Sequence, residues 1–508
     1  MDDCPKTASF IDIGTNSIHI LVVRFFEDCM GTPVFQDKET VRLGQSLYQT
    51  GVIDQETIDK AKLVVSRFVR ISRDMGADDI LVCATCAARE AGNARELIDA
   101  LESEGVEVKV ISGLEEARLI RLGVFGPGGL DKRSLNIDIG GGSTEIALCE
   151  GAEDIYLDSL SIGSVRLAYG VGIDQGHAMT FQEYDYLRRQ VDLLSYRTCR
   201  KIREEGFEHA YGSSGTMIAL AEMCAVKRGD GDASYMMYYE VAQLMKSLYS
   251  KDVEERTSVP GMNPSRADII VAGGAVAEEL MHLLGIDRIE ISPNGLKQGM
   301  EIDYLMRMGH TAFDVRDSSV MSLANRCRYD RAHAENVQKN AMFLFDSMKR
   351  EGLHAMGDGI RTLLSYAATL HDIGEFISYA KHNVHSYMII LNSFLPGFDN
   401  KELKAMALMA RFHHKKFPDR GSKYLEDLNP RDKDEILMCA MILKTADILD
   451  RHRNSSVTDM DFEIIDGEAV LTIGSAEDVS MEVWKLNTTK EEFFDVFRRP
   501  LKISKVML

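Results

Sequence analysis

Two glycine-rich turns in the sequence have the residue types of a phosphate-binding site. The first is DIGTNS (residues 12–17), which follows the apolar run 8–11, and the second is DIGGGST (138–144), which follows 135–137. Glycine lets the backbone approach a ligand closely, so such a turn at a strand end presents N–H groups and hydroxyls to an anion. One turn alone gives weak support, because most glycine-rich turns bind nothing. Two copies, each with an aspartate at the strand end, indicate a duplicated unit that holds one phosphate chain from both sides.

An arginine and a glutamate between these turns have the chemistry of a clamp and a base. Arg89 follows an expected strand at 79–84 and is placed for bidentate contact with phosphate, although an exposed helix-start arginine is the alternative. Further on, Ser112 and Glu115 fit a capping box at the start of a helix. Glu116 is then about 100° further round that helix. It is free to face a cleft, unless it is a solvated residue favoured by the helix dipole.

The elements around these residues alternate between strands and helices. Expected strands at 18–25 and 145–150 make each turn the tip of a β-hairpin, and helices are expected at 53–73 and 94–103. This alternation predicts an α/β domain, and its repetition predicts two. From residue 181 the chain becomes strongly helical, with expected helices that include 184–202, 235–249 and one that begins near 294. Residues 309–317 are the expected linker to a helical region, and an Asp466-Gly467 hairpin is expected in a small α+β end.

Length and charge restrict the function classes. The chain has 508 residues, of which 45% are hydrophobic and 27% charged, and its formal net charge is −20. This charge argues against nonspecific binding of duplex nucleic acid. A polyanionic ligand then requires a local basic patch or a divalent cation. Scattered cysteines, no signal-peptide pattern and no apolar run of membrane-spanning length predict a cytoplasmic protein without a membrane partner.

Several runs of the sequence resemble those of a known family. FIDIGTNSIH, ATCAARE, ISGLEEARL and NIDIGGGSTEI, in this order and spacing, resemble the exopolyphosphatase and guanosine pentaphosphate phosphohydrolase family of the sugar kinase, actin and Hsp70 superfamily. The resemblance continues through residues 211–217, 259–268 and a strand and turn at 269–275. It covers about residues 8–306 and implies two duplicated actin-like (ribonuclease H-like) α/β domains at 1–126 and 127–308. The remainder resembles a helical HD-like domain (309–457) and a small α+β domain (458–508) of longer members.

The resemblance also implies roles for individual residues. Glu116 matches the catalytic carboxylate, with Arg89 beside the phosphate chain, and Asp138 and Glu145 match positions associated with magnesium (or manganese) and the attacking water. The expected phosphate-binding residues are Gly14, Thr15, Asn16, Ser17, Gly140, Gly141, Gly142, Ser143, Thr144, Gly215 and Arg266.

The helical region has a metal-binding pattern of its own. The order H…HD…D resembles the metal-dependent HD phosphohydrolase fold, whereas a single helix histidine is usually structural. The resemblance implies that His333, His371, Asp372 and Asp447 bind one divalent metal. His385, His413 and His414 are then candidates for a second metal.

Three functions are consistent with these residues. The first is a magnesium-dependent exopolyphosphatase that removes terminal orthophosphate from inorganic polyphosphate. The second is hydrolysis of guanosine pentaphosphate (pppGpp to ppGpp), which requires the same phosphoric anhydride chemistry and a purine pocket. The third is a phosphate-chain or nucleotide sensor without turnover, against which Glu116 argues. The sequence ranks polyphosphate first, and the family resemblance favours a homodimer.

Overall fold

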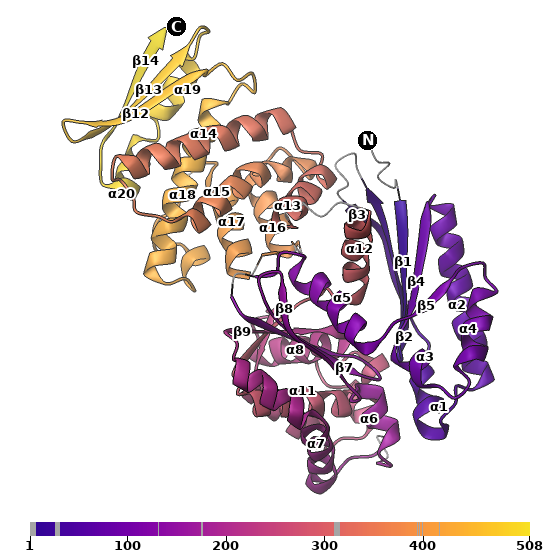
Figure 1. Ribbon diagram of the computed structural model, residues 1–508. Coiled ribbons are helices and arrows are strands. Elements are labelled where there is room, and N and C mark those ends of the chain that lie inside the picture. Colours follow the sequence, from indigo (N-terminus) through magenta and orange to yellow (C-terminus); the bar gives the residue numbers. More distant parts are fainter. Residues whose placement is uncertain are drawn as a thin grey trace. The chain divides into compact units, whose positions relative to one another are not determined.

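The computed structural model of the chain describes residues 7–25, 31–130, 132–173, 176–308, 315–393, 395, 397–398, 400–415 and 417–507. These residues form two compact units, Met1–Val315 and Arg316–Leu508 (Figure 1). Residues 309–314 of the expected linker lie outside the described residues, and 315–317 already belong to a helix, α13 (Val315–Arg326). The finer division into four domains stays a prediction.

The first unit opens with a five-stranded sheet in the order β3-β2-β1-β4-β5. Its strands are β1 (Thr7–Ile13), β2 (Ser17–Phe25), β3 (Gly31–Thr40), β4 (Asp79–Ala84) and β5 (Val108–Val110). β1 and β2 form an antiparallel hairpin, and β4 lies parallel to β1. The first glycine turn is the tip of that hairpin, as predicted.

Alternation of side chains along β1 places apolar residues on both faces of this sheet. Ile11 and Ile13 pack in one core with residues of α2 (Gln55–Asp74) and α4 (Ala94–Glu102), which cover that face in Figure 1. Ala8 and Phe10 pack in another core with residues of α5 (Gly113–Phe125) and α12 (Leu296–Arg307). Two short helices, α1 (Leu43–Thr50) and α3 (Cys86–Glu90), lie at the glycine-turn end of the strands (Figure 1).

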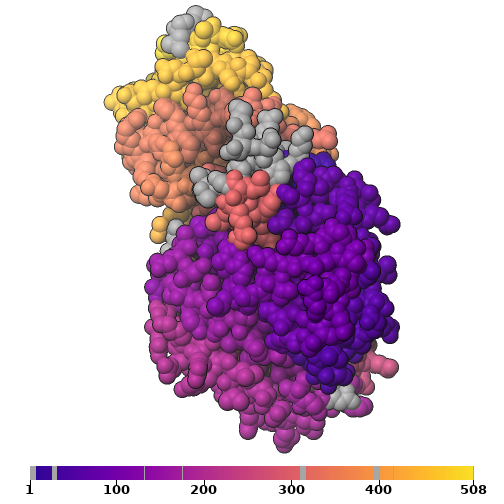
Figure 2. All heavy atoms as spheres, turned by 45° about the vertical axis from the view of Figure 1, so that its right-hand side comes forward, coloured from indigo at the N-terminus to yellow at the C-terminus, as the bar shows by residue number. Residues whose placement is uncertain are grey.

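A second sheet repeats the first. Its strands are β6 (Ser134–Ile139), β7 (Thr144–Glu150), β8 (Glu153–Leu160), β9 (His209–Ser213), β10 (Tyr235–Met237) and β11 (Arg288–Ile291). The order β8-β7-β6-β9-β11 matches β3-β2-β1-β4-β5, and β10 is added at the edge. The duplication predicted from the two turns is therefore confirmed. In Figure 2 the indigo and magenta halves of the first unit meet along a continuous surface.

Helices complete the second half of this unit. They are α6 (Ser164–Gly170), α7 (Phe181–Glu205), α8 (Ser214–Arg228), α9 (Tyr238–Leu248), α10 (Val253–Thr257), a 3₁₀ turn η1 (Pro264–Arg266) and α11 (Ile270–Leu284). Residues of α7, α8, α9 and α11 share one apolar core with β6 and β7.

Two expectations for this half are wrong. The run 269–275 forms the start of α11 instead of a strand and turn. Its β-branched residues favour a strand locally, but the helix is buried on all sides, and Gly274 admits the side chain of Met245, whose sulfur would lie 2.0 Å from an added Cβ. The expected helix 235–249 begins only at Tyr238, because residues 235–237 pair with β11 as an edge strand.

The second unit is mostly helical. Its helices after α13 are α14 (Arg331–Arg350), α15 (Asp358–Leu370), the 3₁₀ turn η2 (Ile373–Phe376), α16 (His382–Asn392), α17 (Asn400–Phe412), the 3₁₀ turn η3 (Lys423–Leu425) and α18 (Pro430–Leu449). A three-stranded sheet follows, with β12 (Asp459–Ile465), β13 (Glu468–Ser475), α19 (Ser480–Asn487), α20 (Lys490–Phe497) and β14 (Leu501–Met507). The Asp466-Gly467 turn has φ values of 52° and 84° and joins β12 to β13 as expected. None of the described helices is long and apolar enough to cross a bilayer.

Candidate active site

The two glycine turns have the same local structure and lie against each other. The Gly14 N–H donates to the carbonyl of Ser17 (3.1 Å), and the Gly140 N–H donates to the carbonyl of Ser143 (3.0 Å). A Cβ added to Gly141 would lie 3.1 Å from the Cβ of Thr15, and one added to Gly142 would lie 2.7 Å from the Thr15 hydroxyl oxygen. Only glycine therefore permits the turns to approach this closely.

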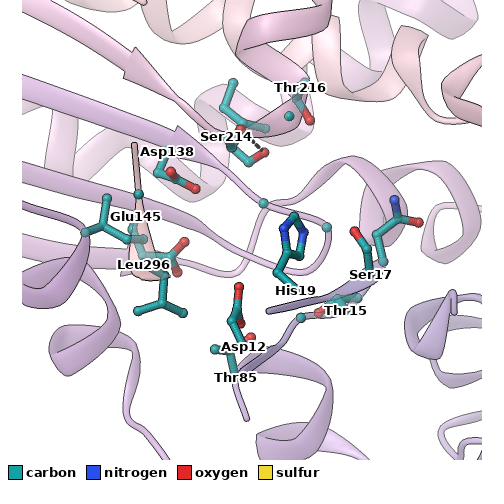
Figure 3. Close-up of a pocket in the computed structure, with 18 of the residues that line it drawn as sticks. Asp12, Thr15, Ser17, His19, Thr85, Asp138, Glu145, Ser214, Thr216 and Leu296 are labelled. Carbon is teal, nitrogen blue, oxygen red and sulfur yellow. Dashed lines mark hydrogen bonds between the residues drawn. The ribbon is translucent and has the colours of Figure 1, made fainter. Parts of the chain in front are cut away.

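A pocket of about 340 Å³ opens between these turns (Figure 3). Its lining includes Glu116, Asp138, Glu145 and every predicted phosphate-binding residue except Thr144. The Thr144 hydroxyl instead donates to the carbonyl of Ile162 at 2.6 Å. The lining also contains groups that the sequence analysis did not select, namely Asp12, His19, Lys38, Thr85, Ser214, Thr216 and Lys297.

Strand register positions the carboxylates of the second sheet. Asp138 on β6 lies directly opposite Glu145 on β7, and Glu145 lies opposite Ser159 on β8. The Ser159 hydroxyl donates to Glu145 Oε1 (2.8 Å), and the Ser213 hydroxyl on β9 donates to Asp138 Oδ2 (2.5 Å). These hydroxyls orient the two carboxylates into the pocket, where Figure 3 shows them on the same side.

The matching row of the first sheet carries different chemistry. Asp12 on β1 lies opposite His19 on β2, and His19 lies opposite Lys38 on β3. Asp12 therefore corresponds to Asp138, His19 to Glu145 and Lys38 to Ser159. The first half presents an imidazole and an ammonium where the second half presents a carboxylate and a hydroxyl. His19 could have been found from its short distance in sequence to the first turn. Lys38 could not, because only the pairing of β2 with β3 brings it beside His19.

Glu116 and Arg89 form a partly buried ion pair at the edge of the pocket. Ser112 caps α5 by accepting from the Glu115 N–H (3.2 Å), as predicted. The Glu115 carboxylate, however, accepts from Arg118 at 2.8 and 2.9 Å, so this part of the expected capping box is replaced by an ion pair. Arg89 Nη1 donates to Glu116 Oε2 (2.6 Å) and to the carbonyl of Ile111 (3.0 Å). Arg89 thus contacts the expected base, and it is not among the residues that line the pocket.

Burial raises the pKa values of the pocket carboxyls. The pKa of Asp12 is raised to about 7 by burial and by the Glu116 charge. That of Glu116 is raised to about 7 by burial, against the lowering effect of Arg89, and that of Asp138 to about 6 by burial. Burial and the charges of Glu116 and Asp138 also raise the pKa of Glu145. This concentration of buried carboxylates fits a divalent cation with hard oxygen ligands such as Mg²⁺.

Cationic groups line the same pocket. The pKa of Lys38 is lowered to about 8 by burial and by the charges of Arg266 and Lys297, and burial also lowers the pKa values of Lys297 and Arg266. The Arg266 guanidinium lies over Gly215, where an added Cβ would be 1.9 Å from Nη2. Among the described residues, the buried Thr15 hydroxyl and Asp12 Oδ1 also lack a hydrogen-bond partner. One buried arginine, two lysines, the Thr15 hydroxyl and the loop N–H groups together suit a chain of phosphates.

In the second unit, the four residues expected at the HD-like site come together. His333 Nε2 lies 3.5 Å from Asp447 Oδ1 and 3.7 Å from Asp372 Oδ2, and His371 Nε2 lies 3.7 Å from Asp447 Oδ1. His382, which the sequence analysis did not select, takes the place expected for His385 and groups with His413 and His414. His382 is the first residue of α16, and His385 follows one helical turn later. The sequence offered no signal for His382 beyond this closeness to His385.

The fold is a duplicated α/β architecture, and its pocket contains carboxylates and cations side by side. The Ppx/GppA phosphatase family matches residues 22–308, and the family's domain III matches residues 315–490. The chain therefore belongs to the Ppx/GppA phosphatase family and is a hydrolase of that family.

Similar proteins include two guanosine-5'-triphosphate,3'-diphosphate pyrophosphatases. The one from Aeromonas hydrophila is 30% identical over 421 residues, which cover 80% of this chain and 81% of the relative. The one from Aliivibrio fischeri is 26% identical over 441 residues, with 86% and 87% covered.

Solved structures resemble a smaller part of the chain. An exopolyphosphatase from Cytophaga hutchinsonii is 28% identical, with a TM-score of 0.55, and the match covers 60% of this chain and 98% of that one. A family member from Aquifex aeolicus shares the fold at 21% identity, with a TM-score of 0.50 and coverage of 60% and 100%.

Proposed function

We propose that this protein hydrolyses the terminal 5′ phosphoanhydride bond of guanosine 5′-triphosphate,3′-diphosphate and releases orthophosphate. The sequence ranked polyphosphate first, but the relatives that align over most of both chains carry the pyrophosphatase name, which favours the nucleotide. The observation that carries the proposal is the polarised pocket, with Lys38, Lys297 and Arg266 among its cations and Glu116, Asp138 and Glu145 among its carboxylates. The phosphate chain requires the cations, and the attacking water requires a carboxylate beside them.

The chain's own residues divide the reaction between them. The N–H groups of both turns, with Lys38 and Arg266, bind nonbridging phosphate oxygens and orient the terminal phosphorus. Glu116 accepts a proton from a water molecule while the oxygen of that water bonds to the terminal phosphorus. The bond from this phosphorus to the bridging oxygen breaks. The electron pair of that bond stays on the β-phosphate of the nucleotide. Arg89 holds the Glu116 carboxylate in place before it accepts the proton.

Asp138 and Glu145 are the residues that would hold a magnesium ion. Both side chains are buried, and that burial raises their pKa values. Asp12, whose Oδ1 has no hydrogen-bond partner among the described residues, lines the same pocket. A magnesium ion held there would neutralise negative charge on the phosphate oxygens.

Inorganic polyphosphate is the second candidate substrate. The exopolyphosphatase from Cytophaga hutchinsonii, which is 28% identical, matches 60% of this chain and supports polyphosphate as an alternative. Both substrates present the same terminal phosphoanhydride to the pocket.

One assay separates the candidates. Phosphate release is compared for guanosine 5′-triphosphate,3′-diphosphate, long polyphosphate, tripolyphosphate and ATP, each with magnesium or manganese. We expect the highest kcat/KM with the guanosine nucleotide and one phosphate released per molecule. Highest kcat/KM with long polyphosphate would transfer the assignment to the second candidate. Binding of either ligand without phosphate release would indicate a sensor.

A further inference from the structure

Asn136 is a buried amide within an apolar run of β6. Its neighbours in the strand are Leu135 and Ile137, and it is only 1% exposed. Its Oδ1 atom has no hydrogen-bond partner among the described residues. A buried amide with an unpaired oxygen is less favourable than an apolar side chain of the same size. Asn136 does not line the pocket, so its place in the strand has to be explained by what its nitrogen contacts.

The amide nitrogen of Asn136 donates to a serine that itself holds a pocket carboxylate. Asn136 Nδ2 lies 3.1 Å from Ser213 Oγ, and Ser213 Oγ lies 2.5 Å from Asp138 Oδ2. Asn136 and Asp138 are two residues apart on β6 and so share a face of the sheet, and Ser213 lies opposite Asp138 on β9. All three side chains are buried. Two hydrogen bonds therefore form a relay from the interior of the sheet to the pocket.

The chemistry of the three groups sets the direction of this relay. A carboxylate only accepts, so the Ser213 hydroxyl donates its single proton to Asp138. Of the two polar atoms of the Asn136 side chain, only the nitrogen can then donate to the lone pairs of that hydroxyl, which assigns Nδ2 and Oδ1. Asn136 thus leaves the hydroxyl proton one direction, toward the carboxylate.

Ser213 is the N-cap residue of α8, yet its side chain does not cap that helix. A serine at this position usually accepts a hydrogen bond from an N–H group of the first turn with its side-chain oxygen. The Ser213 hydroxyl is instead held between Asn136 and Asp138. The relay has therefore replaced the usual structural task of this serine.

The first half of the unit lacks the relay. Asp12 is the counterpart of Asp138, and the residue opposite Asp12 on β4 is Cys83. Two positions before Asp12 the chain has Phe10, which packs in an apolar core. A thiol is a weak donor, and a phenylalanine side chain has no donor. The two polar residues thus occur only beside the carboxylate that is paired with Glu145, where the proposed function places the magnesium ion.

We propose that Asn136 is a positioning residue for the Asp138 carboxylate. Through the Ser213 hydroxyl, it holds that carboxylate in one orientation before a cation binds. Hydrogen-bond partners behind a metal ligand typically raise metal affinity by about 10- to 100-fold. The inference rests on the proposed function only in assigning magnesium to Asp138.

Metal binding by the full-length chain tests the relay with Mn²⁺ as the probe. Chelator-treated protein is titrated, and the equivalent that the wild type binds and Asp138→Asn does not bind reports the pocket. We expect Asn136→Leu to weaken this equivalent by about tenfold, and Ser213→Ala by at least as much. The matched control is Ser134→Ala, because this buried hydroxyl of β6 donates to the carbonyl of Lys132 (2.9 Å) and should not affect Mn²⁺.

A double variant separates a positioning role from a merely structural one. If Asn136 acts only through Ser213, Asn136→Leu should add no further loss of Mn²⁺ affinity to Ser213→Ala. Chemical unfolding should show Asn136→Leu to be at least as stable as the wild type, because leucine removes a buried unpaired oxygen. A structural role predicts the opposite on both counts, namely losses that add and a less stable protein.

Activation by Mn²⁺ provides a kinetic counterpart. With the substrate that the assay above identifies, the Mn²⁺ concentration for half-maximal phosphate release should rise about tenfold in Asn136→Leu, with a maximal rate near that of the wild type. A lower maximal rate with an unchanged Mn²⁺ dependence would overturn the proposal.

Three results of the binding experiments would also overturn it. They are equal Mn²⁺ affinity of Asn136→Leu and the wild type, additive losses in the double variant, and no equivalent that depends on Asp138. If Asn136→Leu fails to fold, Asn136→Val replaces it, since valine suits a strand. The binding experiments need no nucleotide, so a failed relay is distinguishable from a wrong substrate.

Discussion

Two adjacent glutamates in α5 have separate tasks. Glu115 accepts two hydrogen bonds from Arg118 at the outer side of the helix, and Glu116 is buried at the pocket with Arg89 as its partner. Burial raises the pKa of Glu116 to about 7, so that at neutral pH a substantial fraction of this carboxyl still needs to lose its proton before it can act as a base.

This environment predicts a pH dependence of activity. A base must be unprotonated, so kcat/KM should rise with pH along a one-proton limb with its midpoint near 7, the pKa of Glu116. Arg89 lowers that pKa, and therefore Arg89→Ala should move the limb to higher pH. The measurement is kcat/KM from pH 5 to 9 for both proteins. A limb that stays in place or moves to lower pH in Arg89→Ala would contradict the assignment.

Sequence reasoning found the residues that have a local signature. The two turns, Glu116 and Arg266 all fall in recognisable runs, and the structure brings them to one pocket. Lys38 has no such signature, because only the pairing of β2 with β3 places it beside His19. His382 was missed for a related reason, since the bend before α16, and not the spacing of histidines, decides which ring faces Asp372.

At the scale of elements, the site depends on two hairpin tips in direct contact. Gly142 lies against the first tip, where an added Cβ would be 2.7 Å from the Thr15 hydroxyl oxygen, and it would also be 2.4 Å from the Tyr48 hydroxyl oxygen of α1. If either tip moved away from the other, it would also shift β1, which carries Asp12, or β6, which carries Asp138.

Gly142→Ala should therefore separate the two tips. We expect a loss of stability of about 1–3 kcal/mol from overpacking, together with a fall in kcat/KM. Gly128→Ala is the matched control, because an added Cβ there has no atom within 4 Å. Chemical unfolding and phosphate release measure the two effects. Equal behaviour of the two variants would show that the tips do not need this contact.

The cation row of the first sheet predicts a separate effect on binding. In the proposed function, Lys38 contacts the phosphate chain equally before and during the reaction. Lys38→Ala should therefore raise KM on the order of tenfold with little change in kcat. The control is Lys60→Ala, at an exposed position of α2. Steady-state kinetics at two salt concentrations measure both values. An unchanged KM for Lys38→Ala would place the phosphate chain elsewhere in the pocket.

For the whole molecule, a formal net charge of −20 has to be reconciled with the proposed polyanionic substrate. Lys38, Arg266 and Lys297 line the pocket itself, so the proposed function places the phosphate chain beside local positive charge. The duplicated architecture was predictable because the two turns repeat in the sequence. The start of α11 was not, because its strand-like residues form a helix only through burial among neighbouring elements.

Each unit has its own hydrophobic core, so two unfolding transitions are expected by calorimetry. Mg²⁺ should stabilise only the first unit. Its free energy of unfolding should rise by about 2.7 kcal/mol at a hundredfold excess of Mg²⁺ over Kd, and its transition temperature should rise accordingly. The effect should be larger at pH 8 than at pH 5.5, because the pKa of Asp138 is about 6 and protons compete with the metal below it. Asp138→Asn should abolish the shift. A shift that persists in this variant, or that grows at low pH, would exclude this carboxylate as a ligand.

The most direct test of the whole account is single-turnover phosphate release from guanosine 5′-triphosphate,3′-diphosphate by Glu116→Gln, compared with Glu115→Gln. The two variants make the same chemical change at neighbouring positions of one helix. If Glu116 is the base, Glu116→Gln should release phosphate on the order of 100-fold or more slowly than the wild type while it still binds the nucleotide. Glu115→Gln should remain close to the wild type. A Glu116→Gln protein with a wild-type rate, or equal losses in both variants, would contradict the account.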